Sequence, residues 1–463
     1  MRACTGFGEK HFGRIFLGDV RRTRRLVETA DALWRRPRGS LPEKMGDPAA
    51  LKGLYRLMDQ DLVTHDRLIS QHRAQVHQSM AQGSGVVLLL QDATEFNYTS
   101  RTSLADQLGS IGRGQGKGYL CHHILAVEEK DQQVLGIASQ ILFKRPIKPR
   151  DESRQAKRAR KDRESLLWQT CRDQVGEAPA GKRWVDVADR GADIFEFLEH
   201  QCHRGRCFVV RSKYDRKLHA EDARALTLHG LARCLKDLGQ TTLEVQSTLA
   251  QPGRTAQVRV AAGHVQVQAP PYPRGQHGKG SLDLEVVHVQ EIDPPAHGEA
   301  VEWILLTNLA CHSLEAALTV AGYYATRWVI EEYHKAQKSG CSIEQPQFTE
   351  VQRLEPLIAL LSVVAVELLK LRDAARRKDR ASQPARQIMP QEAVTVLSAW
   401  RWKDQDRQPT ILEFMLALAR LGGHQNRKAD GLPGWITLWK GWIALQDMIR
   451  GVRAMQLERC GQT

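Results

Sequence analysis

Two segments that read as strands, each leading into an acidic residue, place the strongest constraint on the fold. The apolar run 86–91 is followed by Asp92, and the second segment, 182–188, is followed by Asp189. An apolar run without alternation is typical of a strand that is buried on both faces, so helices must cover both sides of the sheet. The sequence therefore predicts an α/β fold. Ligands of open α/β sheets gather at the carboxyl ends of strands, which makes both acids candidate site residues.

Two further segments, 118–127 and 133–142, read as strands, and the turn at 129–132 between them predicts a hairpin. The glycines at 109–118 fit neither the Walker A spacing nor the dinucleotide-binding spacing. We expect a flexible loop there. A helix at 164–176 precedes the strand that ends at Asp189.

From residue 206 to residue 308 the apolar period changes to that of strands separated by Gly and Pro, which indicates an antiparallel, β-rich insertion. We predict a helical N-terminal region at 1–75, a catalytic core at 76–345 that contains this insertion, and a helical C-terminal region at 346–463. The segments with helical period after the insertion are 313–338, 353–377, 390–401, 410–421 and 433–457.

The balance of charge favours a polyanionic partner. The 463 residues carry a formal net charge of +14, and nucleic acid is the commonest partner of such a chain. Arginines gather in the predicted helix that begins near residue 18, where a DNA contact and a solvated face are both open. Residues 143–163 are still denser in Lys and Arg, and form either a DNA-tracking surface or a charged loop.

Other partner classes find less support. No N-terminal segment has the pattern of a signal peptide, and the apolar run 357–366 is too short to span a bilayer. We expect no membrane association. The nine cysteines are scattered without zinc-site spacing, so we expect reduced thiols in a cytoplasm.

A third acid lies in a stripe of polar residues within the segment 313–338. At about 100° per residue, Tyr324, Arg327, Glu331, Lys335 and Lys338 fall on one side of a helix. An ordinary amphipathic helix places aliphatic side chains on such a stripe. One carboxylate among phosphate-binding groups indicates metal-assisted chemistry on a polyanion.

The order of a three-stranded meander, a helix, a fourth strand and a later helix with a final acid is that of the ribonuclease H-like fold, with a mixed five-stranded sheet. Three carboxylates, from Asp92, Asp189 and Glu331, would converge there. Such a set can hold two divalent cations, and oxygen ligands suit Mg²⁺, with Mn²⁺ as a substitute. Three neighbouring acids remain as alternatives: Glu95, Asp186 and Glu332.

The spacing Tyr324-x2-Arg327-x3-Glu331-x6-Lys338 resembles the Y-R-E-K signature of the IS4-type DDE transposases. The amino-acid sequence of residues 324–340 is similar to that of the Tn5-like branch of this family. Further patches that resemble it are residues 17–27, 189–194, 208–213, 418–423 and 435–442. The resemblance covers nearly the whole chain, although residues 240–290 match only in pattern.

The resemblance implies a cut-and-paste DNA transposase in which Asp92, Asp189 and Glu331 bind two catalytic metal ions. Tyr324, Arg327 and Lys338 would then hold phosphates near the scissile bond. In the Tn5-like branch, cleavage proceeds through a DNA hairpin.

The resemblance also places DNA-contacting residues around the acids. Trp303 matches the tryptophan on which an unstacked base rests, although a core position is open for it, and Trp328 is a second candidate. Arg211 and Lys213 are candidates for DNA contact, with surface ion pairs as the alternative.

The partners implied are transposon ends, target DNA and a second copy of the chain, joined through the C-terminal region. The tryptophans at 435, 439 and 442 fit either that interface or a core. The compartment implied is the bacterial cytoplasm, at the nucleoid. Two alternatives remain: a DDE-type endonuclease or resolvase without strand transfer, and a DNA-binding repressor without catalysis.

Overall fold

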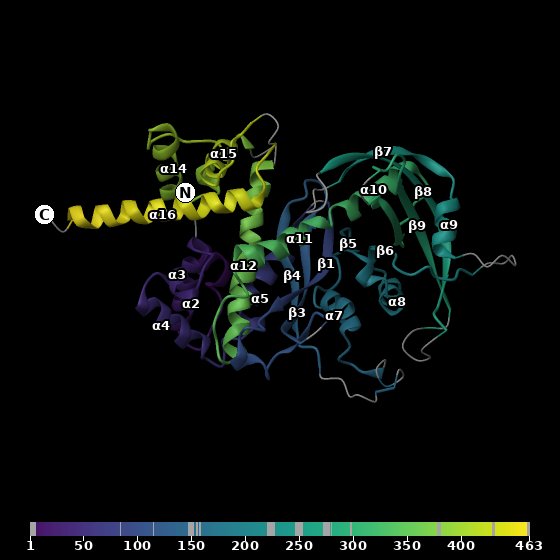
Figure 1. Cartoon of the computed structure of the whole chain (residues 1–463), viewed down its shortest axis with the longest axis horizontal. Coiled ribbons are helices and arrows are strands. Elements are labelled where there is room, and N and C mark those ends of the chain that lie inside the picture. The colour runs from purple at the N-terminus through teal and green to yellow at the C-terminus, as the bar shows by residue number, and fades with distance from the viewer. Residues whose placement is uncertain are drawn as a thin grey trace.

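The computed structural model describes residues 6–83, 85–113, 115–146, 152–153, 156, 159–219, 227–245, 253–271, 278, 280–296, 299–376, 381–427 and 431–460. A mixed sheet lies at the centre of this part of the chain, and helices flank it on both sides (Figure 1). The predicted α/β fold, with helical regions at both ends of the chain and a core consistent with the ribonuclease H-like fold, is confirmed.

Ten strands of the described part form this one sheet, in the order β2-β3-β1-β5-β6-β10-β9-β8-β7, with β4 paired to β3. Their bounds are β1 (Val86–Asn97), β2 (Gly109–Ile111), β3 (Gly116–Glu128), β4 (Val134–Phe143), β5 (Arg183–Ala188), β6 (Cys207–Arg211), β7 (Asp237–Val245), β8 (Arg254–Gln268), β9 (Ser281–Glu291) and β10 (Glu302–Thr307).

The predicted meander is confirmed as the antiparallel strands β1, β3 and β4. β5 pairs with β1 in parallel, and β6 continues in parallel beside β5. The apolar runs explain this arrangement, since β1 and β5 are buried between helix layers along most of their length.

Three expectations about this sheet were wrong in detail. The glycine-rich stretch is not simply a loop, because β2 pairs with β3, and a Cβ at Gly118 would lie 1.9 Å from the carbonyl oxygen of Phe96. These strands approach too closely for a side chain, so glycine serves close packing there. Asp92 does not end its strand, since β1 continues to Asn97. The antiparallel strands do not form a separate sheet, because β10 pairs with β6 and extends the core sheet through β9, β8 and β7.

The N-terminal helices are α1 (Phe7–Phe12), α2 (Val20–Arg35), α3 (Leu41–Met45), α4 (Pro48–Met58) and α5 (His65–Gln82). Asp19 caps α2 by accepting a hydrogen bond from the backbone of Arg21, and Asp47 caps α4 through Ala50. These caps fix where α2 and α4 begin, and α4 ends at Met58.

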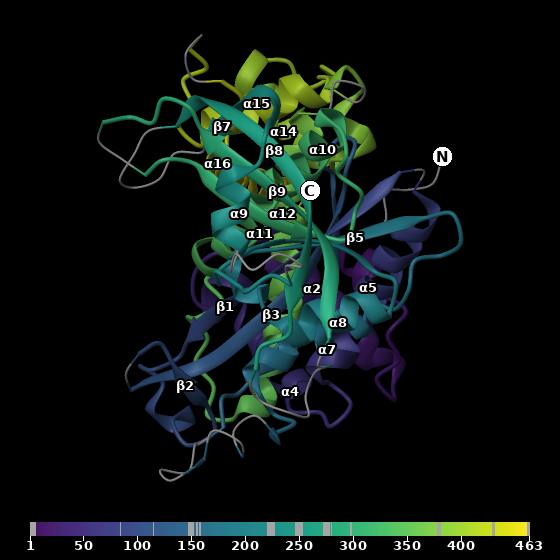
Figure 2. The same cartoon turned by 90° about the vertical axis from the view of Figure 1, so that its right-hand side faces the viewer.

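The remaining helices pack around the sheet and beyond its meander end (Figures 1 and 2). They are α7 (Leu167–Asp173), α8 (Phe195–His203), α9 (Leu228–Cys234), α10 (Leu314–Ala325), α11 (Trp328–Lys335), α12 (Val351–Arg376), α14 (Gln391–Trp402), α15 (Ile411–Leu421) and α16 (Trp435–Cys460). The apolar run 357–366 is buried throughout within α12, as expected of a core helix. No helix in the described ranges is long and apolar enough to cross a membrane.

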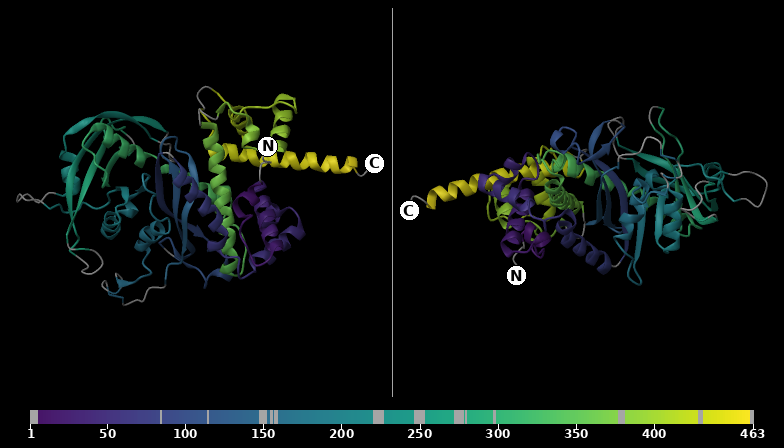
Figure 3. Two further views of the ribbon diagram at one scale, coloured as in Figure 1. Left: turned by 180° about the vertical axis from the view of Figure 1, so that it is seen from behind. Right: turned by 90° about the horizontal axis from the view of Figure 1, so that it is seen from below.

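The C-terminal helices pack against both the core and the N-terminal helices. Trp435, Trp439 and Trp442 are all buried within this single chain, so the alternative of a core position holds for them. The indole of Trp442 donates a hydrogen bond to the carbonyl oxygen of Trp34 on α2. The last turns of α16 extend away from the other elements (Figure 3). The cysteines at 121, 171, 202, 207, 234, 311 and 341 are free thiols.

Asp186 holds the layers around β5 together. Its carboxylate is fully buried and accepts hydrogen bonds from Arg172, Gln91 and Gln201, at 2.8, 2.7 and 2.8 Å. Removing one partner of a buried ion pair leaves the other charge uncompensated.

We therefore expect Asp186→Ala to lower the free energy of unfolding by about 3–5 kcal/mol. Urea titration followed by circular dichroism measures this change. Glu164→Gln is the matched control, because Glu164 pairs with Arg145 at the surface and its loss costs at most about 1 kcal/mol. Equal effects of the two substitutions would contradict a structural role for Asp186.

Candidate active site

Backbone pairing brings Asp92 and Asp189 together. The parallel ladder between β1 and β5 ends with Gln91 opposite Ala188, and the next residue of each strand is one of the two acids. The Asp189 side chain accepts a hydrogen bond from the backbone of Gly191 at 2.8 Å, which fixes the turn after β5. Both acids thus lie at the carboxyl end of the parallel pair, as the sequence predicted.

Glu331 reaches the same place from α11. The guanidinium of Arg327 lies 2.5 Å from Oε1 of Glu331 and 3.6 Å from Oδ2 of Asp92, so it bridges the helix and the strand. About a fifth of the Asp92 side chain and about half of the Glu331 side chain are exposed. Arg327 thus links Glu331 to Asp92, and Asp189 lies beside Asp92 at the end of the parallel ladder.

The surroundings of Asp92 disfavour its charged form. Burial, the largest cause, and then the charge of Asp189 raise the pKa of Asp92 to about 7, with a smaller contribution from Glu331, against the opposing effects of the Ala93 backbone and Arg327. A carboxyl group with so raised a pKa in a partly open position is a candidate functional residue.

The polar stripe does not lie on one continuous helix, contrary to expectation. Tyr324 belongs to the end of α10, a turn at 326–327 follows, and Glu331 lies on α11. The hydroxyl of Thr326 donates to the carbonyl oxygen of Gly322 and so satisfies the end of α10. Lys338 lies beyond α11 in the π-helical turn η4 (Ala336–Gly340).

This break separates the residues of the stripe by environment. Tyr324 is buried, Arg327 and Lys338 are half-buried, and Lys335 is exposed. The charge of Lys338 helps to lower the pKa of Glu95, after the larger effects of the Gly112 backbone and Arg145, so Lys338 lies on the side of β1. π-helical turns recur at functional sites, and this one re-aims the lysine after α11.

The alternative acids have other partners. Asp186 is saturated by the three hydrogen bonds described above. Glu95 pairs with Arg145 at 2.6 Å and accepts from the backbone of Gly112. Glu331 is the acid of α11 whose charge acts on Asp92. The geometry therefore favours Asp92, Asp189 and Glu331 over Glu95, Asp186 and Glu332.

Trp303 lies beside the acids. Its ring meets that of Tyr324 edge to face, with 4.9 Å between centroids, and Arg327 lies 5.8 Å from the centroid of the same tyrosine. Trp303 is half-buried, so one part of its ring packs and another faces outward. Trp328 packs against the main core and is half-buried too.

Arg211 and Lys213 lie at the end of β6, next to β5. The guanidinium of Arg211 donates to the carbonyl oxygen of Glu302 at 2.8 Å, so it contacts the strand that carries Trp303. Lys213 is exposed, 5.4 Å from the ring centroid of the equally exposed Tyr214. Sequence reasoning assigned no role to Tyr214.

Asp193 is a second residue that the sequence left without a role. It is fully buried and accepts hydrogen bonds from the backbones of Lys213 and Tyr214, at 2.7 and 2.9 Å. Arg216 completes its contacts with an ion pair. Asp193 therefore fixes the loop that carries Lys213. In the sequence, its position four residues after Asp189 was the feature that could have pointed to this role.

The donor set fits a divalent cation, although the acids are not arranged around one. Across the described ranges, no three His, Cys, Asp or Glu side chains stand close enough to hold a metal ion. Arg327 supplies the positive charge between Asp92 and Glu331 instead. Carboxylate oxygens that repel one another are the ligands that Mg²⁺ and Mn²⁺ prefer.

A comparison with known families concerns the N-terminal helices. Residues 5–63 match the transposase DNA-binding family. This range covers α1 to α4, and on α2 the side chains of Arg21, Arg24 and Arg25 are exposed. The match supports a DNA-binding transposase, and hence DNA as a partner and a DNA-processing activity.

The basic segment at residues 143–163 offers fewer free positive charges than α2 within the described residues. Arg160 and Arg163 are engaged in ion pairs with Asp162 and Glu196, as Arg145 is with Glu95 and Glu164. Lys144 pairs with Glu355, and Lys161 is exposed. The basic residues at 148, 150, 154, 157 and 158 lie outside the described residues, so the two interpretations of this segment stay open.

Replacing charges around Asp92 tests the electrostatics of the site. We expect Asp189→Asn to lower the pKa of Asp92, because a neighbouring negative charge is lost. Arg327→Gln removes a positive charge that favours the carboxylate, so it should raise that pKa. Carbon-13 NMR titration of the Asp92 carboxyl in metal-free protein measures both shifts. Shifts in the same direction would disprove the arrangement.

Proposed function

We propose that the protein is an IS4-type DDE transposase, close to the Tn5-like branch, that excises DNA by cut-and-paste transposition. The observation that carries this proposal is the juxtaposition of Asp92 and Asp189 at the end of the β1–β5 ladder, with Glu331 joined to them through Arg327. The transposase DNA-binding match at residues 5–63 supports it independently.

In this proposal Asp92, Asp189 and Glu331 hold two Mg²⁺ ions. Ions of this kind supply charge stabilisation for the attacking and leaving oxygens of an in-line displacement at phosphorus. Arg327, which bridges two of the acids in the metal-free chain, would be released from one of them. Its guanidinium then becomes available for a phosphate, for which its fork of donors is suited.

The chemistry proceeds in successive displacements. Water attacks the phosphorus at the transposon end, the bond from phosphorus to O3′ breaks, and the freed 3′-oxygen leaves as a hydroxyl. This hydroxyl attacks a phosphodiester of the opposite strand, the bond from that phosphorus to the 3′-oxygen of the flanking DNA breaks, and a hairpin closes. A second water attacks the hairpin phosphorus and releases the same 3′-hydroxyl. This hydroxyl finally attacks a phosphodiester of the target and displaces a 3′-oxygen of the target strand. Arg327 and Lys338 position the phosphates throughout, together with the hydroxyl of Tyr324.

Hairpin formation requires a sharply bent strand, so one base must leave the stack. Trp303 is suitably placed to receive it, since it packs edge to face on Tyr324 beside Arg327. Arg211 and Lys213 would follow the backbone of the same strand. A second copy of the chain would hold the other transposon end, joined through the C-terminal helices.

The decisive test replaces each acid in turn. We expect Asp92→Ala, Asp189→Ala and Glu331→Ala to reduce Mg²⁺-dependent cleavage of DNA that carries the flanking inverted repeats by more than about 10³-fold, since each removes a metal ligand. Gel-based cleavage and electrophoretic mobility shift assays measure activity and DNA binding, and binding should be retained. Lys335→Ala, on the exposed side of α11, is the control.

The same assay separates the alternatives. An endonuclease or resolvase would cleave without joining 3′ ends to target DNA, and a repressor would bind without cleaving. Cleavage that survives all three substitutions would refute the catalytic assignment.

The hairpin step has its own expected outcome. Trp303→Ala should slow hairpin closure by about 10-fold or more, because stacking on an aromatic ring contributes about 1–3 kcal/mol, and it should leave the first nick nearly unchanged. Denaturing gels of end-labelled DNA resolve nicked and hairpin products. Trp303→Phe keeps an aromatic face and should restore most of the rate; equal rates of hairpin closure in wild type and Trp303→Ala would contradict this role.

A further inference from the structure

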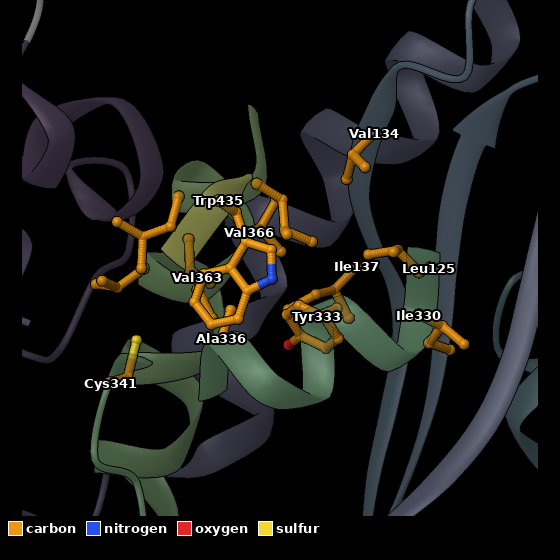
Figure 4. Packing of buried hydrophobic residues seen from close by; sticks show 14 of the residues in the cluster. Leu125, Val134, Ile137, Ile330, Tyr333, Ala336, Cys341, Val363, Val366 and Trp435 are labelled. Atoms are coloured by element: carbon orange, nitrogen blue, oxygen red, sulfur yellow. The ribbon is translucent and has the colours of Figure 1, made fainter. Parts of the chain in front are cut away.

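The helix that carries Glu331 depends on tertiary contacts for its position. α11 has eight residues, and no side chain caps its first turn. A helix this short is not stable by itself. Its buried face packs Ile330 and Tyr333 beside Leu125 and Ile137 of the sheet (Figure 4). Apolar contacts alone are non-directional, whereas a hydrogen bond fixes the position of α11 along the sheet more narrowly.

One hydrogen bond joins this helix to the strand position beside Asp92. His123 on β3 lies directly opposite Asp92 in the β1–β3 ladder, and opposite residues project from the same face of a sheet. Nδ1 of His123 lies 3.2 Å from Nε2 of His334. His334 follows Glu331 by three residues, which places both on one side of α11.

The surrounding network fixes the direction of this hydrogen bond. Nε2 of His123 accepts from the amides of Gln140 and Gln337, at 2.8 and 3.2 Å. The proton of the ring is therefore on Nδ1, which donates to Nε2 of His334. Ser362 on α12 accepts from the same two amides at 2.9 Å. The histidines therefore lie in a buried hydrogen-bonded network with His123 protonated on Nδ1, and within it Oε1 of Gln337 accepts no hydrogen bond from the described residues.

Both rings are neutral. Burial, the largest cause, lowers the pKa of His334 to about 3, and it holds the pKa of His123 well below its usual value. The bond thus adds no charge near the acids. It joins α11 to β3 directly, in addition to the ion pairs through which Arg327 links Glu331 and Asp92.

We propose that His123 and His334 are positioning residues that hold Glu331 close enough to Asp92 for both carboxylates to bind the same divalent cation. This inference rests on the proposed function, because it assigns the acids to metal binding. Other side chains hold α11 elsewhere: the hydroxyl of Tyr333 donates to the carbonyl oxygen of Ser362 on α12, not to the sheet.

The test uses the full chain and Mn²⁺. His334→Phe keeps the volume of the ring and removes the acceptor, whereas His334→Gln keeps an acceptor for His123. Isothermal titration calorimetry measures Mn²⁺ binding to the protein on end DNA, and hydrogen exchange with mass spectrometry measures opening of residues 328–335 without metal. We expect about 10-fold weaker Mn²⁺ binding and about 10-fold faster exchange in His334→Phe, the size of one lost hydrogen bond. His334→Gln should restore most of both.

Ser139→Ala is the matched control for general destabilisation. Ser139 is equally buried, and its hydroxyl donates to Gln174, away from α11. It should change neither Mn²⁺ binding nor exchange of residues 328–335. If His334→Phe does not fold, His334→Asn takes its place with the same expectation, since the shorter amide does not reach His123.

Wild-type Mn²⁺ binding in His334→Phe would overturn the inference, and so would equal weakening in Ser139→Ala. Failure of the proposed function gives a different result. If wild type binds Mn²⁺ through Asp92 and Glu331 but does not cleave transposon ends, the positioning role stands and the transposase chemistry fails. If wild type binds no Mn²⁺ and Glu331→Ala changes nothing, both fail.

Discussion

The site depends on a conflict of charge that the backbone itself imposes. Parallel pairing of β1 with β5 ends at Gln91 and Ala188, so Asp92 and Asp189 must emerge side by side at a half-buried position. Neither side chain can avoid the other without breaking the ladder. Burial, the largest cause, and the neighbouring charge of Asp189 together raise the pKa of Asp92 to about 7. Everything that approaches this position, including α11, Arg327 and any cation, therefore meets an excess of negative charge that the fold cannot relieve.

The N-terminal helices share buried contacts with the core that carries this site. Ile137 on β4 donates its backbone N–H to Nε2 of His72, and Nδ1 of His72 lies 3.2 Å from Nδ1 of His11 on α1. His11 in turn lies 3.5 Å from a carboxylate oxygen of Glu367 on α12. Burial lowers the pKa of both histidines, so the contact is made by neutral rings. A DNA end bound to the N-terminal helices would thus have a fixed position relative to the sheet that carries Asp92 and Asp189.

The sequence predicted correctly those strands whose pattern is local. The strand-like segments before Asp92 and Asp189 predicted β1 and β5, and the order of elements predicted the meander and its partner strands. Three features escaped prediction because they depend on contacts distant in sequence. The pairing of β2 with β3 requires the approach of Gly118 to Phe96, and the extension of the sheet requires the pairing of β10 with β6. The break at 326–327 lies inside an unbroken helical period, so only packing of α11 against the sheet determines it.

One arginine serves two partners at the start of α11. Arg327 is the N-cap residue of this helix, one turn before Glu331, and its side chain reaches both Glu331 and Asp92. Three carboxylates against one guanidinium leave the site negative, and a phosphate would be repelled from it. DNA must therefore be brought by basic side chains further out, such as the exposed arginines of α2. In the proposed function, cations that neutralise the acids would weaken the attraction that holds Arg327 to them, and the same guanidinium would then turn to the incoming phosphate.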